Sequence, residues 1–121
     1  MSLRRSGVLC HISSLPGDWG IGDFGSGARA FINFMQKTGF TLWQTLPLTP
    51  VLPMFGNSPY SSPSTFAGNT LFISPEELCR EGLISREEAG ASILPSDKKV
   101  DFIAAAECRR TLLRSAWKNF N

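Results

Sequence analysis

The fold is decided by three consecutive stretches of the chain: GVLCHI (Gly7–Ile12), GARAFINFMQKT (Gly27–Thr38) and TLWQTL (Thr41–Leu46). The outer two are short, mostly apolar runs rich in strand formers, which is typical of strands buried on both faces of a sheet. The middle stretch carries apolar residues at helical spacing. A strand, a helix and a second strand with short joints predict a parallel βαβ unit, and therefore an α/β fold.

Capping residues predict where the helices begin and end. Ser26 is the expected N-cap and Gly39 the expected left-handed C-cap of the first helix. Shorter helices are expected after Ser74 and Ser85, because each serine is followed three residues later by glutamate, the capping-box pattern. The tail from residue 101 to 120 is amphipathic and predicts a longer helix. Its expected apolar face consists of Phe102, Ala105, Cys108, Leu112, Ala116 and Trp117.

The composition limits the classes of function. With 121 residues and 42% hydrophobic residues, the chain can bury a core but forms at most one domain. A net charge of +2 is too small to favour nucleic acid or an anionic membrane as partner, and no apolar run is long enough to span a membrane. Three scattered cysteines, no CxxC pair and a single histidine argue against disulfides and metal sites. Without an export signal, reduced thiols and a cytoplasmic location are expected.

A long segment without an expected regular element runs from Pro47 to Asn69 and contains five prolines. Loops of this length are uncommon unless they are functional. No acidic residue lies between Phe24 and Pro75, so we expect the loop to be enclosed by further protein. Two parallel strands do not form a stable sheet by themselves. We therefore expect residues 1–121 to be an incomplete N-terminal part of a larger barrel or sheet, without an internal domain boundary, that needs the remainder to fold.

The sequence Gly20-Ile-Gly-Asp-Phe-Gly25 has the GxGxxG pattern of a dinucleotide-binding turn. That pattern requires its first glycine at the end of the strand, so that the helix N-terminus meets the pyrophosphate. Residues 13–19 intervene here, and no acid follows about twenty residues later to hold a ribose hydroxyl. A glycine-rich turn without a nucleotide is the preferred interpretation.

Candidates for acid, base or nucleophile are few. His11 lies at the end of the first expected strand and is equally compatible with ligand binding at a barrel rim and with a neutral, hydrogen-bonded core imidazole. Cys10 and His11 are adjacent on a strand and point to opposite faces, so they do not form a proton-transfer pair. The glutamate pairs 76–77 and 87–88 lie at expected helix starts, where the helix dipole favours them structurally. Asp18 and Asp23 are loop acids without an evident partner.

One part of the long loop, MFGNSPYSS (residues 54–62), combines aromatic rings with hydroxyl and amide groups and lacks charge. Sugars present CH-rich faces that stack on rings and hydroxyls that need donors and acceptors. Tyr60, the only tyrosine, and Ser58 supply both. A rigid surface loop with buried aromatics remains the alternative.

An ordered set of motifs resembles the N-terminal region of the amylomaltase family, the 4-α-glucanotransferases or disproportionating enzymes of glycoside hydrolase family 77. The resemblance is clear from about residue 6 to residue 81 and looser in the tail. The motifs are SGVLCH (6–11), SLPG (14–17), GIGDFG (20–25), LWQTLPL (42–48), NSPY (57–60) and FAGN (66–69).

The resemblance implies a (β/α)₈ barrel, with the loops 13–25 and 47–69 on the catalytic face. It implies a retaining transfer of α-1,4-glucan segments between maltooligosaccharides, starch or glycogen, without a metal or organic cofactor. The nucleophile, the acid/base and a supporting aspartate would lie outside these residues, so no catalytic residue is assigned and the 121 residues alone are expected to be inactive. The implied substrate-binding residues are Phe55, Asn57, Ser58 and Tyr60, with His11 and Trp43 at rim or interior positions. A non-catalytic glucan-binding or interaction module is the alternative function.

Overall fold

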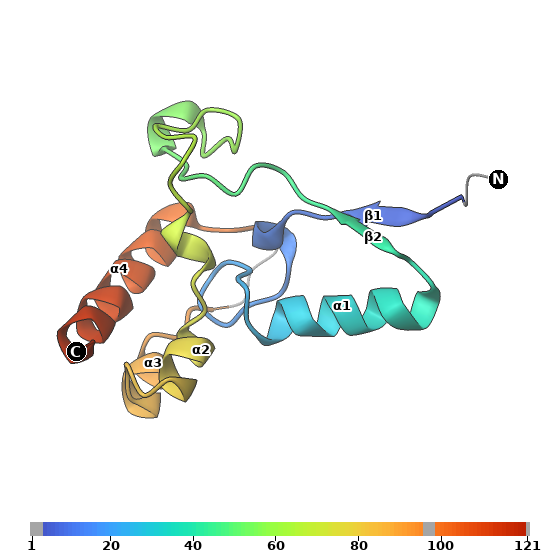
Figure 1. The fold of residues 1–121 in the computed structure, drawn as a ribbon. Helices are drawn as coiled ribbons and strands as arrows, with labels where there is room; N and C mark the ends of the chain where they lie inside the picture. The colour runs from blue at the N-terminus through green and yellow to red at the C-terminus, as the bar shows by residue number, and fades with distance from the viewer. Residues whose placement is uncertain (1–3, 96–98, 121) are drawn as a thin grey trace.

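Two short parallel strands form the sheet of this protein (Figure 1), for which a computed structural model describes residues 4–95 and 99–120. Strand β1 (Gly7–Leu9) pairs with β2 (Leu42–Gln44), with Val8 opposite Trp43. Helix α1 (Ser26–Thr38) lies between them in the sequence and runs beside them in space. The predicted parallel βαβ unit is confirmed.

Both strands are shorter than the expected ranges 7–12 and 41–46, because each has one neighbour in the described chain and ends where that neighbour diverges. The chain after β1 turns into a 3₁₀ helix, η1 (Ile12–Ser14). Leu9 of β1 is 60% exposed and Leu42 of β2 is 48% exposed, so each strand carries an apolar side chain that is partly open to solvent.

Both caps of α1 are glycines. Its C-cap is Gly39 at φ 80°, a left-handed conformation that glycine adopts without strain, as predicted. Its N-cap is Gly25 instead of the expected Ser26, which is already the first helical residue.

Three further helices form the second half of the chain: α2 (Pro75–Arg80), α3 (Arg86–Ala91) and α4 (Phe102–Asn119). The capping box at Ser85 is confirmed. The one expected at Ser74 is not formed, because the Glu77 carboxylate instead pairs with Arg29 of α1 at 2.6 Å and with Arg80.

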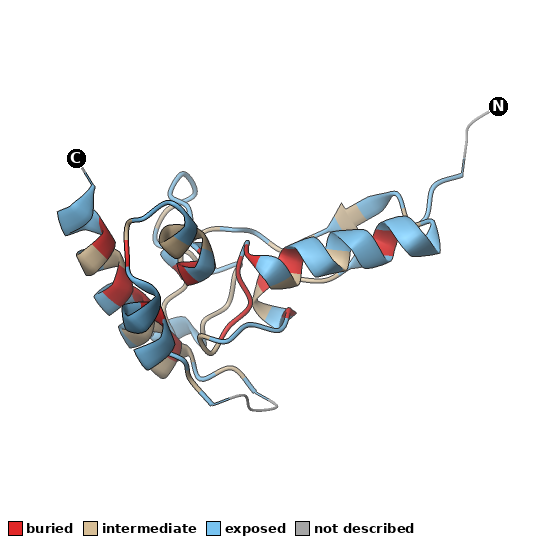
Figure 2. Ribbon diagram, turned by 90° about the horizontal axis from the view of Figure 1, so that it is seen from below, coloured by how far each residue is buried: buried red, intermediate tan, exposed pale blue. Residues whose placement is uncertain are grey.

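The buried side of α4 contains Ala105, Arg109, Leu112 and Ala116 (Figure 2). Trp117, which was expected on this face, is 76% exposed, and a cation takes part in the buried face instead. One core cluster joins Ile12, Ile21, Phe72 and Ala105 with α1, and a second cluster joins α3 with α4. The long tail helix therefore packs on both halves of the molecule and holds them together.

Candidate functional site

The loop between β2 and a 3₁₀ helix, η3 (Thr70–Phe72), projects from the body of the molecule, drawn in green at the top of Figure 1. Its two ends meet where the Asn69 N–H donates to the Leu48 carbonyl at 3.0 Å. The Asn69 side chain accepts from the Leu71 N–H at 3.0 Å and starts η3, and Asn69 itself is buried. A fixed base therefore carries a loop in which no residue from 49 to 68 is fully buried.

The tip of this loop is shaped by a tight turn. A 3₁₀ helix, η2 (Pro53–Phe55), ends in two consecutive left-handed residues, Gly56 at φ 64° and Asn57 at φ 55°. Glycine and asparagine are the residues that tolerate this conformation most readily. The Asn57 N–H returns to the Leu52 carbonyl at 3.0 Å and closes the turn. Asn57 is thus a turn-forming residue, in addition to any contact that its amide makes.

The aromatic and hydroxyl groups of the loop face outward. Phe55 is 53% exposed and Tyr60 is 73% exposed, so both rings can be reached from solvent. The Ser58 hydroxyl oxygen accepts from the Tyr60 N–H at 3.3 Å, which leaves its own proton free to donate. The loop thus presents two rings and a hydroxyl donor together, and the alternative in which its aromatics are buried does not apply to Phe55 and Tyr60.

His11 lies apart from the loop tip, between β1 and η1. Its ring meets Phe72 edge-on, with centroids 5.4 Å apart. Burial lowers the pKa of His11 from its ordinary value of 6.5, which favours the neutral imidazole. Its buried Nδ1 has no partner among the described residues. The imidazole is thus partly buried and neutral, while the hydrogen bond expected of a core histidine is not seen at Nδ1.

Trp43 also lies away from the loop tip. Its indole N–H donates to the Cys10 carbonyl at 2.7 Å, and its ring packs against Phe31 of α1 with centroids 4.9 Å apart. In the described chain Trp43 therefore joins the two strands to α1. The structure brings Phe55, Asn57, Ser58 and Tyr60 into one loop, but it does not bring His11 and Trp43 to them.

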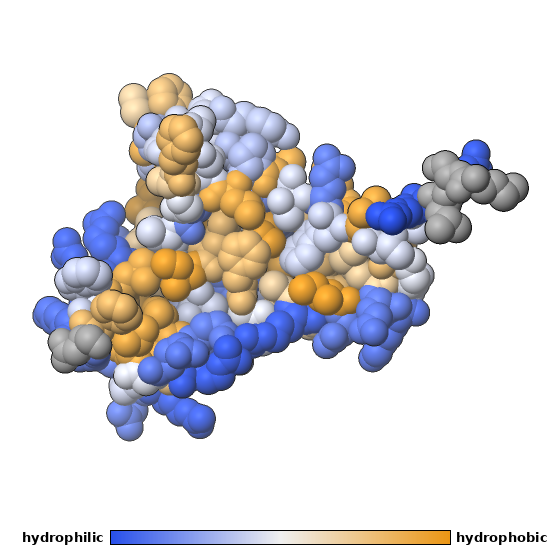
Figure 3. All heavy atoms as spheres, in the orientation of Figure 1, coloured by the Kyte–Doolittle hydropathy of each residue, from blue (hydrophilic) through white to orange (hydrophobic). Residues whose placement is uncertain are grey.

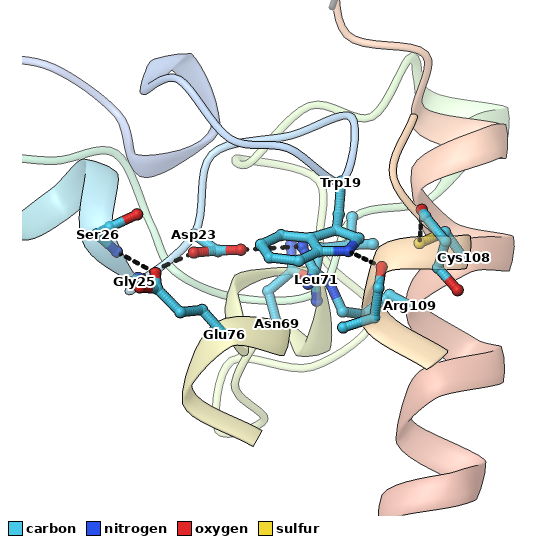
Figure 4. A network of polar contacts seen from close by, with 11 residues as sticks. Trp19, Asp23, Gly25, Ser26, Asn69, Leu71, Glu76, Cys108 and Arg109 are labelled. Atoms are coloured by element: carbon cyan, nitrogen blue, oxygen red, sulfur yellow. Dashed lines mark hydrogen bonds and ion pairs between the residues drawn. The ribbon is translucent and has the colours of Figure 1, made fainter. Parts of the chain in front are cut away.

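A buried ion pair was missed by the sequence analysis, which left Asp23 without a partner. Asp23 Oδ2 lies 3.3 Å from Arg109 Nη2 of α4, and their side chains are 8% and 1% exposed (Figure 4). Asp23 Oδ1 also accepts from the Gly25 N–H at 2.9 Å. The signal that could have found this pair is a cation at a core-facing position of the tail helix.

The GIGDFG turn does not leave a free anion site. The Ser26 N–H, at the start of α1, donates to Glu76 Oε2 at 3.1 Å, and the Gly25 N–H is taken by Asp23 (Figure 4). The chain's own carboxylates therefore occupy donors that a pyrophosphate would need. The interpretation of this sequence as a glycine-rich turn agrees with this arrangement.

Among residues 4–95 and 99–120, no group of three or more His, Cys, Asp or Glu side chains is placed to hold a metal ion. The helices in these same ranges include none that is long and apolar enough to cross a membrane.

The profile of the glycoside hydrolase family 77, described as 4-alpha-glucanotransferase, matches residues 10–121. The chain belongs to this family. It is 45% identical over 118 residues to a 4-alpha-glucanotransferase of Aquifex aeolicus, with 98% of the chain and 24% of the relative covered. A chloroplastic or amyloplastic 4-alpha-glucanotransferase of Solanum tuberosum is 42% identical over 118 residues, with 95% and 20% covered.

A solved structure agrees with the sequence comparison. The amylomaltase from Streptococcus agalactiae in complex with acarbose superimposes with a TM-score of 0.89 at 47% identity, and covers 98% of this chain. The chain spans 24% of the length of that structure and of the Aquifex relative. The family resemblance deduced from the motifs is confirmed.

Proposed function

We propose that this chain supplies the first two strands and the substrate-facing lip of a (β/α)₈ barrel in a 4-α-glucanotransferase. The observation that carries the proposal is the match of residues 10–121 to the family, together with the superposition on an acarbose-bound amylomaltase. The exposed apolar residues of the two-stranded sheet support it, since further strands and helices would cover them.

The reaction proposed is a retaining transfer between α-1,4-glucans such as maltooligosaccharides, starch or glycogen. One carboxylate attacks the anomeric carbon while a second acid protonates the leaving oxygen, and the second group then deprotonates the 4-hydroxyl of the acceptor. Water must be excluded until the acceptor is bound, because it would otherwise intercept the glycosyl-enzyme.

Four carboxylates of the chain already make structural contacts. Asp23 is buried against Arg109, Glu76 caps α1, Glu88 closes a capping box and Asp101 caps α4. A retaining pair needs two carboxyl groups about 5–5.5 Å apart on either side of the scissile bond. We therefore propose that both reacting carboxylates come from protein outside these 121 residues.

The role proposed for the loop is to hold the sugar ring next to the reacting bond. Tyr60 offers a ring face and a hydroxyl, Ser58 offers a free hydroxyl proton, and Phe55 offers a stacking face for an outer sugar unit. Asn57 fixes the turn that spaces them. His11 and Trp43 are proposed to face the barrel interior or rim, where neighbouring strands would complete their surroundings.

The compartment proposed is the cytoplasm, on the evidence of the three free thiols, which reducing compartments preserve.

The test measures disproportionation of maltotriose by the full-length protein and by residues 1–121 alone. The full-length protein is expected to release glucose and build longer chains, whereas the 121 residues are expected to do neither. Turnover by the short chain would contradict the assignment of the carboxylates. Maltooligosaccharide binding by the short chain, with no transfer by the full-length protein, would instead identify a non-catalytic binding module.

The contribution of the loop is tested by substitution in the full-length protein. Tyr60→Ala is expected to lower kcat/KM by about tenfold or more, because a stacking face and a hydrogen-bonding hydroxyl are lost together. Tyr60→Phe separates the two effects. Met54→Ala is the matched control, since Met54 is an exposed apolar side chain of the same loop, 78% exposed. Equal losses in Tyr60→Ala and Met54→Ala would remove Tyr60 from the site.

A further inference from the structure

A second feature, separate from the loop tip, is a cavity of about 620 Å³ between α4 and the chain segments 50–51 and 69–71. A volume of this size is sufficient for a small molecule. None of the residues assigned above to glucan binding lines this cavity. Hydrophobic atoms, orange in Figure 3, gather across the middle of one face of the molecule, and hydrophilic atoms lie toward its margin.

One residue that lines the cavity, Arg109, has a buried side chain. Its side chain is 1% exposed, and Nη2 contacts Asp23 at 3.3 Å. Neither Nε nor Nη1 has a hydrogen-bond partner among the described residues. Buried donors rarely remain unpaired, because leaving them so is costly. The Arg109 guanidinium is therefore sealed behind the cavity wall against Asp23, and the cations that a ligand can reach are those on the surface of α4.

Three more cations line the same cavity: Arg110, Arg114 and Lys118. They recur every four residues along α4, so they lie on one stripe of the helix. Like charges at this spacing repel, and none of the three forms an ion pair with a described acid. The cavity lining contains no Asp or Glu within the described ranges. The concentration of positive charge favours an anionic ligand.

The other walls are apolar and include the exposed ring of Trp117. This ring stacks on Phe120, with centroids 6.2 Å apart and planes 15° from parallel. An aromatic wall adds nothing to the binding of an inorganic anion, whereas a sugar ring can stack on it. Guanidinium groups match the geometry of phosphate oxygens. The combination is suited to a phosphate group attached to a sugar.

We propose that this cavity binds a phosphate monoester of a glucose unit. The phosphate oxygens accept from Arg110, Arg114 and Lys118, and the sugar ring lies along Trp117. The ligand is either a free sugar phosphate or a phosphate ester carried on a glucan. The choice of glucose rests on the proposed function, whereas the anion site stands on the cavity itself.

Binding is measured by calorimetry in the full-length protein at constant ionic strength, with inorganic phosphate, glucose 6-phosphate and glucose as probes. Glucose 6-phosphate is expected to bind more tightly than phosphate, and glucose is not expected to bind in this cavity. A phosphorylated maltodextrin and its phosphatase-treated counterpart distinguish the two sources, since tighter binding of the phosphorylated polymer than of glucose 6-phosphate identifies the glucan-borne ester. Absence of both glucose 6-phosphate and phosphate binding would overturn the proposal.

Variants at the exposed rim avoid disturbing the buried Arg109. Arg110→Ser with Arg114→Ser is expected to raise the Kd for glucose 6-phosphate by about tenfold or more, because charge-assisted hydrogen bonds are lost. Lys37→Ser with Arg86→Ser removes the same net charge at exposed positions outside the cavity and is expected to leave the Kd unchanged. Equal effects in the two double variants would mean non-specific attraction and would refute the site.

Trp117→Ala tests the sugar wall separately. The Kd for glucose 6-phosphate is expected to rise about tenfold, whereas the Kd for inorganic phosphate is expected to stay unchanged. An equal rise in both Kd values would contradict the stacking of the sugar ring on Trp117. Transfer on neutral maltotriose is the readout of the proposed function. Binding of glucose 6-phosphate without glucan transfer would refute only the proposed function. Glucan transfer without binding of glucose 6-phosphate would refute only the proposed ligand of the cavity.

Discussion

The buried pair of Asp23 and Arg109 provides a sharp test of what holds the two halves of this unit together. Asp23→Asn keeps the size of the side chain and leaves an oxygen to accept from the Gly25 N–H, which now lies 2.9 Å from Oδ1. The substitution therefore removes the negative charge and the acceptor of the Arg109 Nη2 hydrogen bond, because the amide NH₂ takes the place of Oδ2. It leaves the Arg109 guanidinium buried without a counter-charge.

The expected size of the effect follows from the burial of the pair. At a separation near 4 Å two unit charges attract by about 4 kcal/mol when the effective dielectric constant is about 20. Removing one partner of a buried pair costs about 3–5 kcal/mol. Burial raises the pKa of Asp23 and lowers the pKa of Arg109, so both charges have lost hydration on folding. The stabilisation of α4 should fall by about 3–5 kcal/mol.

Hydrogen exchange of the α4 amides in the full-length protein measures this loss directly. Exchange that proceeds through opening of α4 should accelerate by roughly 100-fold or more, since about 1.4 kcal/mol corresponds to tenfold. The double variant Asp23→Asn with Arg109→Met should recover most of the protection, because removing both charges of a buried pair is often neutral or stabilising. Wild-type exchange in Asp23→Asn alone would refute the reasoning.

The remaining predictions concern single side chains. The imidazole of His11, the only histidine in these 121 residues, should titrate by NMR in the full-length protein with a midpoint below pH 6.5. The contribution of the neutral imidazole to folding stability is complete above pH 6.5 and is lost as the pH falls through the lowered pKa. A midpoint of 6.5 or higher would contradict the lowered pKa. Gly25→Ala should lower the melting temperature because its Cβ would lie 2.3 Å from Ser74 Oγ, whereas Gly90→Ala in α3, where the Cβ meets nothing within 4 Å, should add up to about 1 kcal/mol. Ser85→Ala should cost about 1 kcal/mol, seen as faster exchange of the first α3 amides, and unchanged exchange would mean that the capping box contributes nothing.

The parts of the fold that depend on neighbouring residues could be predicted from the sequence. Gly39 and Ser85 act within one turn of their helices, so local chemistry determines their role. The order of strand, helix and strand is likewise a matter of local pattern. Strand length is different, because it depends on how much backbone a partner offers, and the chain itself does not reveal where β1 and β2 part.

The features that join distant segments were the ones missed. Arg109 lies 86 positions from Asp23, and nothing near Asp23 in the sequence indicates a partner. Glu77 fits a capping box by spacing, yet Arg29 attracts it across the molecule. Trp117 fits the apolar spacing of α4, but its neighbour Ala116 occupies the buried position and Trp117 is exposed beside it.

The candidate site was predictable in composition but not in extent. Ring, hydroxyl and amide groups of one loop lie together because they are neighbours in the chain, as Phe55, Ser58 and Tyr60 show. His11 and Trp43 were grouped with them on the strength of the family resemblance. Their contacts in this chain lie with Phe72 and Phe31, so their relation to the loop remains a prediction.

The hydrogen bond between Asn69 and Leu48 has a consequence for how this family can diversify. The loop leaves and rejoins the body of the protein at nearly one point, so its length can change without moving the residues at its base. Doubling the length of such a loop adds only about 0.6 kcal/mol to the entropic cost of closing it. Under the role proposed above for this loop, exchanging residues 49–68 between two homologues should therefore transfer the preference for glucan length.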